Sequence, residues 1–188
     1  MIKEKLLEKL LRKIRISKVI PYLKKSDYIC DIGCGINADF LMSIKSFINK
    51  GWGIDKKVLL DSADNITIKR IELFSSVPFD DNFFDVVTMM AVLEHLNNVS
   101  LILKEVYRIL KPNGILILTT PNPSAKPILE FLAYKLNLLD VNEINDHKYY
   151  CSMNNLIKEL QNAKLKVIKS KFFEFKFNSL VVAKKIIG

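Results

Sequence analysis

The segment Tyr28-Ile29-Cys30-Asp31-Ile32-Gly33-Cys34-Gly35 decides the fold of this chain. Its first five residues form a short apolar run of the kind that becomes a buried strand. Two glycines follow, and a helical pattern begins near residue 38. Glycine permits a tight turn and lets a ligand approach the main chain closely. The sequence therefore predicts a strand, a ligand-binding loop and a helix in succession.

A second short strand, expected over residues 51–55, ends in the carboxylate of Asp55. A carboxylate at the tip of the second strand of a βαβ unit can accept hydrogen bonds from the ribose hydroxyls of a nucleoside. The loop, the spacing and the strand context agree. We therefore expect the glycine loop and Asp55 to bind a cofactor that contains a nucleoside.

After Pro21 the chain alternates apolar strand-like runs with helical patterns, which is typical of βαβ units and of a doubly wound, mostly parallel sheet. The expected strands are 28–32, 51–55, 67–73, 84–89 and 114–120. The expected helices are 38–49, 98–110, 125–138 and 152–163. Two β-rich segments, 166–173 and 179–184, with a turn at Phe177-Asn178, predict a terminal antiparallel hairpin.

The chain has 188 residues, enough for one sizeable core, so we expect a single domain over residues 1–188. Its net charge of +9 is concentrated at one end, because residues 1–25 carry nine Lys and Arg against two Glu. Apolar residues recur at helical spacing there, which predicts a basic amphipathic helix within residues 1–20. That helix either packs on the domain or meets a membrane surface or an acidic partner.

The sequence shows neither a membrane-spanning segment nor a secretory signal, and these features predict the cellular location. The longest apolar runs are shorter than the roughly 20 residues of a membrane-spanning helix, and the N-terminus does not resemble a secretory signal. Three cysteines form no disulfide framework and no zinc-binding pattern, so we expect Cys30 and Cys151 to be buried apolar residues. A soluble, cytoplasmic protein without a metal site is expected.

The glycine signal alone fits two cofactors. Gly33, Gly35 and Ala38 match the dinucleotide fingerprint, which keeps a nicotinamide cofactor open. Asp31 would repel a pyrophosphate at the loop entrance, however, and the chain leaves no second domain to hold a reducible substrate. A cationic sulfonium cofactor that also carries an ammonium group suits Asp31 better.

Five motifs in order resemble class I S-adenosylmethionine-dependent methyltransferases, in the branch often called methyltransferase type 11. They are DIGCG at 31–35, GWGID at 51–55, VPFDDNFFDVV at 77–87, LEHL at 93–96 and EVYRILKPNGILILTTPN at 105–122. The resemblance covers residues 20–185 and implies a Rossmann-like, seven-stranded sheet whose last strand is antiparallel. It also implies S-adenosyl-L-methionine as methyl donor and S-adenosyl-L-homocysteine as product.

The same resemblance assigns cofactor contacts. The loop after the first strand would hold the methionine portion, the second strand tip the ribose, the segment after the third strand adenine, and the segment after the fourth strand the methyl end. The residues so implied are Asp31, Gly33, Cys34, Gly35, Asp55, Lys56, Phe74, Ser75, Met90, Ala91, Val92 and His95. The chain departs from the family at Asn37, where a third glycine is usual, and at Leu73, where an acid usually contacts adenine.

Two histidines are candidates for the acceptor side. His95 follows Glu94 after the fourth strand, where shaping the cofactor wall is its expected role. His147 lies in a loop where the family often places groups that face the acceptor, so it is our candidate catalytic residue, as general base or acceptor ligand. An ordinary loop histidine is the alternative.

The sequence leaves three hypotheses about what the protein does with the methyl group. We expect a small molecule or a sugar- or lipid-linked intermediate, because the segments TTPNPSAKPILEF, DHKYY and FNSLVVAKK resemble relatives associated with surface-polysaccharide synthesis. The apolar segment 127–139, with Tyr149 and Tyr150, either covers an acceptor pocket or packs in the core. An RNA-modifying enzyme that uses the basic N-terminal helix is a second reading, although no motif for methylating base amino groups follows the fourth strand. A non-catalytic regulatory protein that still binds S-adenosylmethionine is a third.

Overall fold

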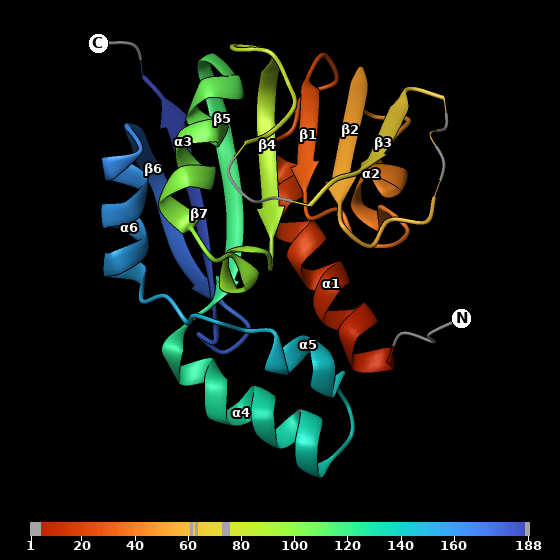
Figure 1. Cartoon of the computed structure of the whole chain (residues 1–188), viewed down its shortest axis with the longest axis vertical. Helices are drawn as coiled ribbons and strands as arrows, with labels where there is room; N and C mark the ends of the chain where they lie inside the picture. The colour runs from red at the N-terminus through yellow and green to blue at the C-terminus, as the bar shows by residue number, and fades with distance from the viewer. Residues whose placement is uncertain (1–4, 61, 63, 73–75, 187–188) are drawn as a thin grey trace.

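The computed structural model describes residues 5–60, 62, 64–72 and 76–186. Within them the strands form one seven-stranded sheet in the order β3-β2-β1-β4-β5-β7-β6 (Figure 1). Strands β1 to β5 pair in parallel, and β7 is antiparallel to both β5 and β6. The predicted α/β class, mostly parallel with an antiparallel last strand, is confirmed.

The elements follow the alternation expected from the sequence. The strands are β1 Tyr28–Ile32, β2 Lys50–Asp55, β3 Ile66–Arg70, β4 Phe84–Met90, β5 Leu110–Pro121, β6 Leu165–Phe173 and β7 Asn178–Lys185. The helices are α1 Leu6–Val19, η1 Ile20–Tyr22, α2 Asp39–Ile44, η2 Leu93–His95, α3 Val99–Ile109, η3 Pro123–Ala125, α4 Lys126–Glu130, η4 Phe131–Lys135, α5 Val141–Asn145 and α6 Met153–Asn162.

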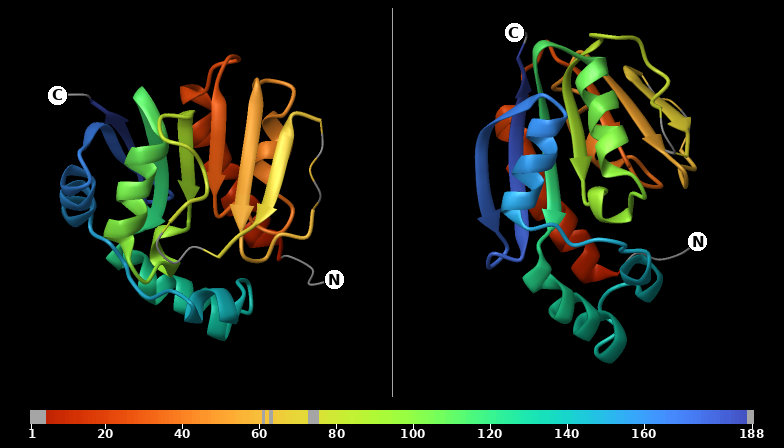
Figure 2. Two further views of the ribbon diagram at one scale, coloured as in Figure 1. Left: turned by 45° about the horizontal axis from the view of Figure 1, so that its top comes forward. Right: turned by 60° about the vertical axis from the view of Figure 1, so that its left-hand side comes forward.

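Helices cover both faces of the sheet. Alternate residues of a strand point to opposite faces, and apolar side chains on both faces have to be buried. On β7, Val181 and Ala183 pack in one apolar cluster with residues of α3 and α6. Leu180 and Val182 pack in a second cluster with residues of α2 and the end of α1. Figure 2 shows α3 and α6 together on one side of the sheet. The near-continuous apolar strands predicted from the sequence are therefore buried on both faces.

The helix predicted over 38–49 is shorter in the structure and ends at Ile44. The side-chain amide of Asn65 donates hydrogen bonds of 3.0 to 3.1 Å to the carbonyls of Lys45, Ile48 and Asn49. A side chain from the loop before β3 thus satisfies carbonyls just beyond the helix end. The sequence pattern around residues 38–49 cannot report a partner from so far along the chain.

The strand predicted over 114–120 begins earlier, at Leu110, directly after α3. Its pairing with β4 jumps from Phe84 opposite Leu110 to Val86 opposite Ile115, which is an irregularity of the β-bulge kind. Asn113 takes a φ of +66° within it. The helix expected over 98–110 therefore ends where predicted, within one residue, and the residues Lys111 to Asn113 that follow belong to the strand.

The segment between β5 and α6 also differs in detail from the prediction. The helix expected over 125–138 consists of η3, α4 and a π-helical turn, η4, in which Leu136 N–H donates to the carbonyl of Phe131. A further helix, α5, begins after Asp140, whose side chain accepts from the N–H of Asn142. Asp140, with Glu143 three residues later, is a helix-start signal in the sequence that the prediction of one helix over 125–138 does not include. The last turn covers residues 174–177, so Asn178 opens β7 instead of closing the turn.

The cysteines lie in the interior of the domain. Cys30, Cys34 and Cys151 are all buried and unbridged, which confirms the expectation for Cys30 and Cys151. Across the described residues, the helices are all too short or too polar to cross a membrane. The expected N-terminal helix is present as α1, and its final residue, Val19, is buried against the domain.

The carboxyl ends of the parallel strands meet at one edge of the sheet. Between β1 and β4 the chain order reverses, and such a switch point is where open α/β sheets bind ligands. Helices α1, α4 and α5 lie at this edge, toward which the arrowheads of β1, β4 and β5 point (Figure 1). The fold therefore brings the glycine loop, the β2 tip and the segment after β4 together.

Candidate functional site

The glycine loop follows β1 and lies against β2. The backbone N–H groups of Gly33 and Cys34 donate to the carbonyl of Ile54 at 2.8 and 3.2 Å. Gly33 and Gly35 have φ values of +73° and +75°, which L-residues rarely adopt. A Cβ on Gly33 would lie 2.3 Å from Val92 Cγ2, whereas a Cβ on Gly35 would meet nothing within 4 Å. Gly33 is therefore a packing position, and Gly35 borders open space.

Gly33→Ala is expected to lower the free energy of unfolding more than Gly35→Ala. Both variants carry the cost of a positive φ, about 1–2 kcal/mol. Only the first also forces a methyl group onto Val92, which adds about 1–3 kcal/mol of overpacking. Urea denaturation of the two variants measures the difference, and equal losses would contradict the close packing of Gly33 on Val92.

Asp31, at the end of β1, is a buried carboxyl group, 2% exposed. Burial raises its pKa to about 7, and the nearby Asp55 charge adds to this effect, against a hydrogen bond of 2.5 Å from the Thr88 hydroxyl. A carboxylate in such a place destabilises the fold unless it meets a cation. Asp31 is thus suited to an ammonium or sulfonium group bound at the loop.

We expect Asp31→Asn to remove a pH-dependent penalty on stability. The folded-state pKa lies above the unfolded value of 3.8, so the wild-type stability that is present below pH 3.8 is lost as the pH rises through 7. The shift corresponds to about 4 kcal/mol at pH 8. Urea denaturation at pH 4 and pH 8 measures it. The variant should lose less stability than wild type between these values, and an identical loss would contradict the raised pKa.

Asp55 ends β2 with its carboxylate fixed by the main chain. One oxygen accepts from the N–H of Gly35 at 3.0 Å and the other from the N–H of Lys57 at 2.7 Å. Each carboxylate oxygen has a second lone pair available. The side chain of the neighbouring Lys56 extends to Asp146, with 3.7 Å between nitrogen and oxygen. The β2 tip is therefore held in a fixed orientation between the glycine loop and the segment after α5.

The segment after β4 forms the opposite wall. Ala91 takes a φ of +56°, and its N–H donates to the carbonyl of Thr119 on β5 at 2.9 Å. Val92 is buried against Gly33, and Met90 lines a small cavity with the glycine loop. The fold thus brings the predicted residues Met90, Ala91 and Val92 beside the predicted loop residues Asp31, Gly33, Cys34 and Gly35.

Helix α1 supplies two residues that were not predicted for the site, Arg12 and Arg15. Arg12 and Arg15 line the same cavity as Asp31, the glycine loop and Met90. Arg12 also forms an ion pair of 3.0 Å with Asp39 at the start of α2. The excess of positive charge near the N-terminus was the available signal, but only the fold shows that these arginines lie at the loop. A carboxylate-bearing ligand would find its counter-charge there.

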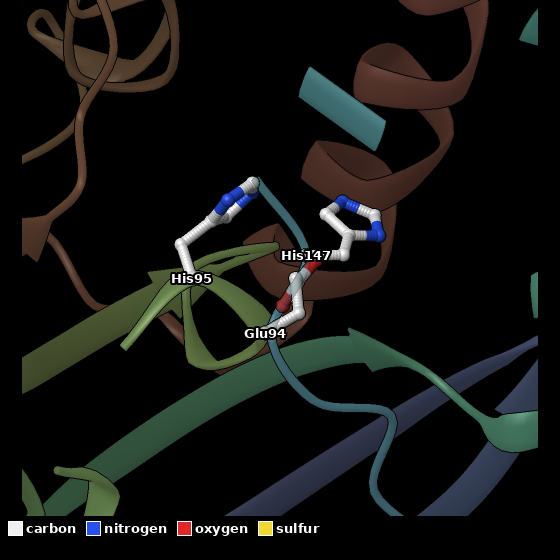
Figure 3. A group of neighbouring side chains, drawn as sticks. All are labelled: Glu94, His95 and His147. Carbon is white, nitrogen blue, oxygen red and sulfur yellow. The ribbon is translucent and has the colours of Figure 1, made fainter. Parts of the chain in front are cut away.

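The two histidines, far apart in the sequence, lie side by side (Figure 3). Their ring centroids are 4.8 Å apart at an interplanar angle of 76°. His95 Nδ1 lies 3.1 Å from an oxygen of Asp146, and His147 Nδ1 lies 2.9 Å from the hydroxyl of Tyr150. The candidate cofactor residue His95 and the candidate catalytic residue His147 therefore belong to one cluster, which the spacing in the sequence did not reveal.

Protonation states in this cluster follow from burial. Burial, reinforced by the nearby His95, lowers the pKa of His147 to about 4. Burial raises the pKa of Glu94, which is 1% exposed. At neutral pH His147 is therefore an uncharged imidazole, able to accept a proton or to bind a metal ion.

The predicted adenine contacts Phe74 and Ser75, together with Leu73, lie outside the described residues. The expected strand 67–73 ends at Arg70 in the structure. Ile71 N–H donates to the carbonyl of Asp55 at 3.0 Å, so the chain leaves β3 beside the β2 tip.

Comparisons with known proteins agree on one family. A family model described as a methyltransferase domain matches residues 3–170. An uncharacterized methyltransferase of Schizosaccharomyces pombe is 31% identical over 113 residues, which cover 51% of this chain and 40% of that protein. The ubiquinone/menaquinone biosynthesis C-methyltransferase UbiE of Neisseria meningitidis is 27% identical over 137 residues, 61% of this chain and 52% of UbiE. The chain therefore spans about half the length of these curated relatives, or less.

Solved structures share the fold at low sequence identity. A chain from a Haloferax volcanii complex of the Trm112 methyltransferase activator with a methyltransferase superposes with a TM-score of 0.73 and 15% identity, covering 98% of this chain and all of that one. A SAM-dependent methyltransferase from Methanosarcina mazei gives 0.68 and 22%, covering 91% and 98%. At these identities the match supports the Rossmann-like fold alone.

Proposed function

Because this chain belongs to the methyltransferase domain family, we propose that it binds S-adenosylmethionine and transfers the methyl group to a small or lipid-linked organic acceptor. The observation that carries the proposal is the fixed carboxylate of Asp55 beside the open loop at Gly35. A nucleoside laid across Gly35 would have its ribose hydroxyls within reach of the remaining lone pairs of Asp55.

The donor groups of the site fit this cofactor. The cavity beside the loop presents the Asp31 carboxyl group and the Arg12 and Arg15 guanidinium groups. We assign Asp31 to the ammonium group and the arginines to the carboxylate of the methionine portion. A dinucleotide pyrophosphate at the same loop would meet Asp31, a group that repels it. Met90, Ala91, Val92 and His95 are then assigned to the wall near the transferred methyl.

When bound, S-adenosylmethionine supplies an electrophilic methyl group on a sulfonium sulfur. The chain's own contribution is alignment, since an in-line displacement depends on holding the acceptor atom opposite the bond that breaks. We assign this role to the His95–His147 cluster, with His147 facing the acceptor as base or as ligand. Its neutral state at pH 7 suits either role.

An apolar acceptor is supported by the segment that covers this edge of the sheet. Several large apolar side chains on and after α4 are exposed, namely Ile128, Phe131, Tyr134, Leu136 and Leu138. This segment is tied to α1, because Lys5 Nζ donates to Asn137 and to the carbonyl of Leu139 at 2.6 and 2.7 Å. The UbiE relatives are named for steps of quinone biosynthesis, which is compatible with an apolar acceptor.

Labelled-methyl transfer tests the proposal. The full chain is incubated with methyl-labelled S-adenosylmethionine and, separately, with a dihydroxyphenol carrying an alkyl chain, a lipid-linked sugar and total tRNA. Label in one of the first two acceptors, and none in tRNA, is the expected result. Label in tRNA alone would replace the acceptor class with RNA. Binding of S-adenosylhomocysteine without transfer to any acceptor would contradict an enzymatic role.

A further inference from the structure

Three potential metal ligands converge near the proposed acceptor position. They are Glu94 and His95, from the 3-10 helix η2 after β4, and His147, from the segment after α5 (Figure 3). One ligand atom from each lies within 4.8 Å of the other two. The sequence predicts no metal site, because its three cysteines match no zinc-binding pattern. Glu94 and His95 lie far from His147 along the chain, so their spacing gives no signal either.

Each of the two histidine rings is oriented by a hydrogen bond at Nδ1. His95 Nδ1 lies 3.1 Å from the Asp146 carboxylate, and His147 Nδ1 lies 2.9 Å from the Tyr150 hydroxyl. Histidines that bind metals commonly donate one ring N–H to a carboxylate, carbonyl or water, which leaves the other nitrogen for the ion. In the tautomer that carries its proton on Nδ1, each of these rings keeps an Nε2 lone pair for an ion.

The third candidate ligand is a carboxylate that the fold has buried. Glu94 is 1% exposed, and Oε2 accepts a hydrogen bond of 3.1 Å from Thr120. A buried carboxylate is costly unless a cation or several hydrogen bonds compensate it. A divalent ion shared with the two histidines compensates this charge, and the hydrogen bond from Thr120 then orients the ligand.

We propose that Glu94, His95 and His147 form a binding site for a divalent transition-metal ion. Two imidazoles and one carboxylate are the donor set of open catalytic zinc sites and of other first-row metals, whereas Mg²⁺ and Ca²⁺ favour all-oxygen sites. In a tetrahedral site, ligand atoms at about 2.1 Å from the ion lie about 3.4 Å from one another. The three ligand atoms lie within 4.8 Å of one another, so binding draws them together by up to about 1.4 Å.

The site deepens the proposed function and rests on it for its role. An acceptor hydroxyl that completes the coordination shell loses its proton to solvent more readily, since a metal ion lowers the pKa of a bound O–H group. The resulting oxygen forms a bond to the methyl carbon as the carbon–sulfur bond breaks, and the thioether product leaves uncharged. His147 then acts on the acceptor through the metal ion, and the acceptor class is an alcohol or phenol.

Metal binding is tested directly with Co²⁺ as a spectroscopic probe. The untagged full chain is treated with a chelator, dialysed and titrated with Co²⁺, and then Zn²⁺ is added as a competitor. We expect visible absorption stronger than that of aqueous Co²⁺, saturating at one ion per chain and abolished by Zn²⁺. A spectrum identical to aqueous Co²⁺ throughout the titration would overturn the site.

Variants identify the ligands. Glu94→Gln, His95→Ala and His147→Ala should each weaken Co²⁺ binding by at least about 10–100-fold. Glu143→Gln, which alters an exposed acid near the cluster, should leave it unchanged. His147→Ala is the informative variant if Glu94→Gln fails to fold, because His147 lies on a surface segment. Unaltered Co²⁺ binding in His147→Ala and His95→Ala would contradict the assignment.

The same protein samples distinguish a failure of the metal-site proposal from a failure of the proposed methyltransferase function. S-adenosylhomocysteine binding is measured on each variant and on the metal-free chain. Cofactor binding with no metal binding would remove the metal site alone. Metal binding with no cofactor binding would retain the site and contradict the methyltransferase proposal.

Discussion

Replacing His147 with alanine is expected to lower kcat by about 10²–10⁴-fold, the usual contribution of a group that helps a reacting atom lose its proton. Affinity for S-adenosylhomocysteine should stay unchanged, because we assign His147 to the acceptor rather than to the cofactor. Steady-state rates with a labelled methyl donor measure the first effect, and calorimetry measures the second. A variant with the wild-type rate would reduce His147 to a loop residue.

The pH profile adds a test that a purely structural role would not pass. The pKa of His147 lies near 4, so the imidazole stays neutral as the pH falls from 8 to about 5. At saturating cofactor, protonation of His147 should therefore lower the rate only below about pH 5. A fall centred near pH 6.5 would instead indicate an ordinary, solvated histidine.

Replacing Asp55 with alanine is expected to weaken the binding of S-adenosylhomocysteine strongly. The carboxylate is assigned two ribose hydroxyls, and each charge-assisted hydrogen bond contributes about 1.5–3 kcal/mol. Affinity for S-adenosylhomocysteine should thus fall by about 10²–10⁴-fold. Asp55 also accepts from Gly35 and Lys57, so part of the loss comes from a looser loop.

A matched control separates these causes. Asp64→Ala removes an exposed carboxylate that forms an ion pair with Lys45, in the same β2 to β3 region but away from the loop. It should leave cofactor affinity unchanged. Equal affinities for wild type and Asp55→Ala in calorimetry would contradict the ribose assignment.

The sheet was predictable because its physical signals are local. Each parallel strand is a short apolar run bounded by polar or glycine residues, and Tyr28–Ile32 was predicted with the bounds that the structure has. The ends of helices and strands were less predictable where a residue from another segment determines them. Asn65 closes α2 from a distant loop, and the bulge opposite Phe84 extends β5 backward to Leu110.

The residues of the candidate site could be predicted from the sequence only where a recognisable motif contains them. The glycine loop and Asp55 are recognisable from spacing alone, and the fold brings them into hydrogen-bond contact. The role of Arg15 and the contact between His95 and His147 depend on how α1 and the segment after α5 close over the sheet. Such contacts are set by tertiary packing, which periodicity does not encode.

The central claim is that the glycine loop binds S-adenosylmethionine rather than a dinucleotide. Isothermal titration of the full chain with S-adenosylhomocysteine, and separately with NAD, tests it most directly. The account predicts saturable binding of S-adenosylhomocysteine that Asp55→Ala weakens, and no binding of NAD at the same concentrations. Saturable binding of NAD with none of S-adenosylhomocysteine would contradict it.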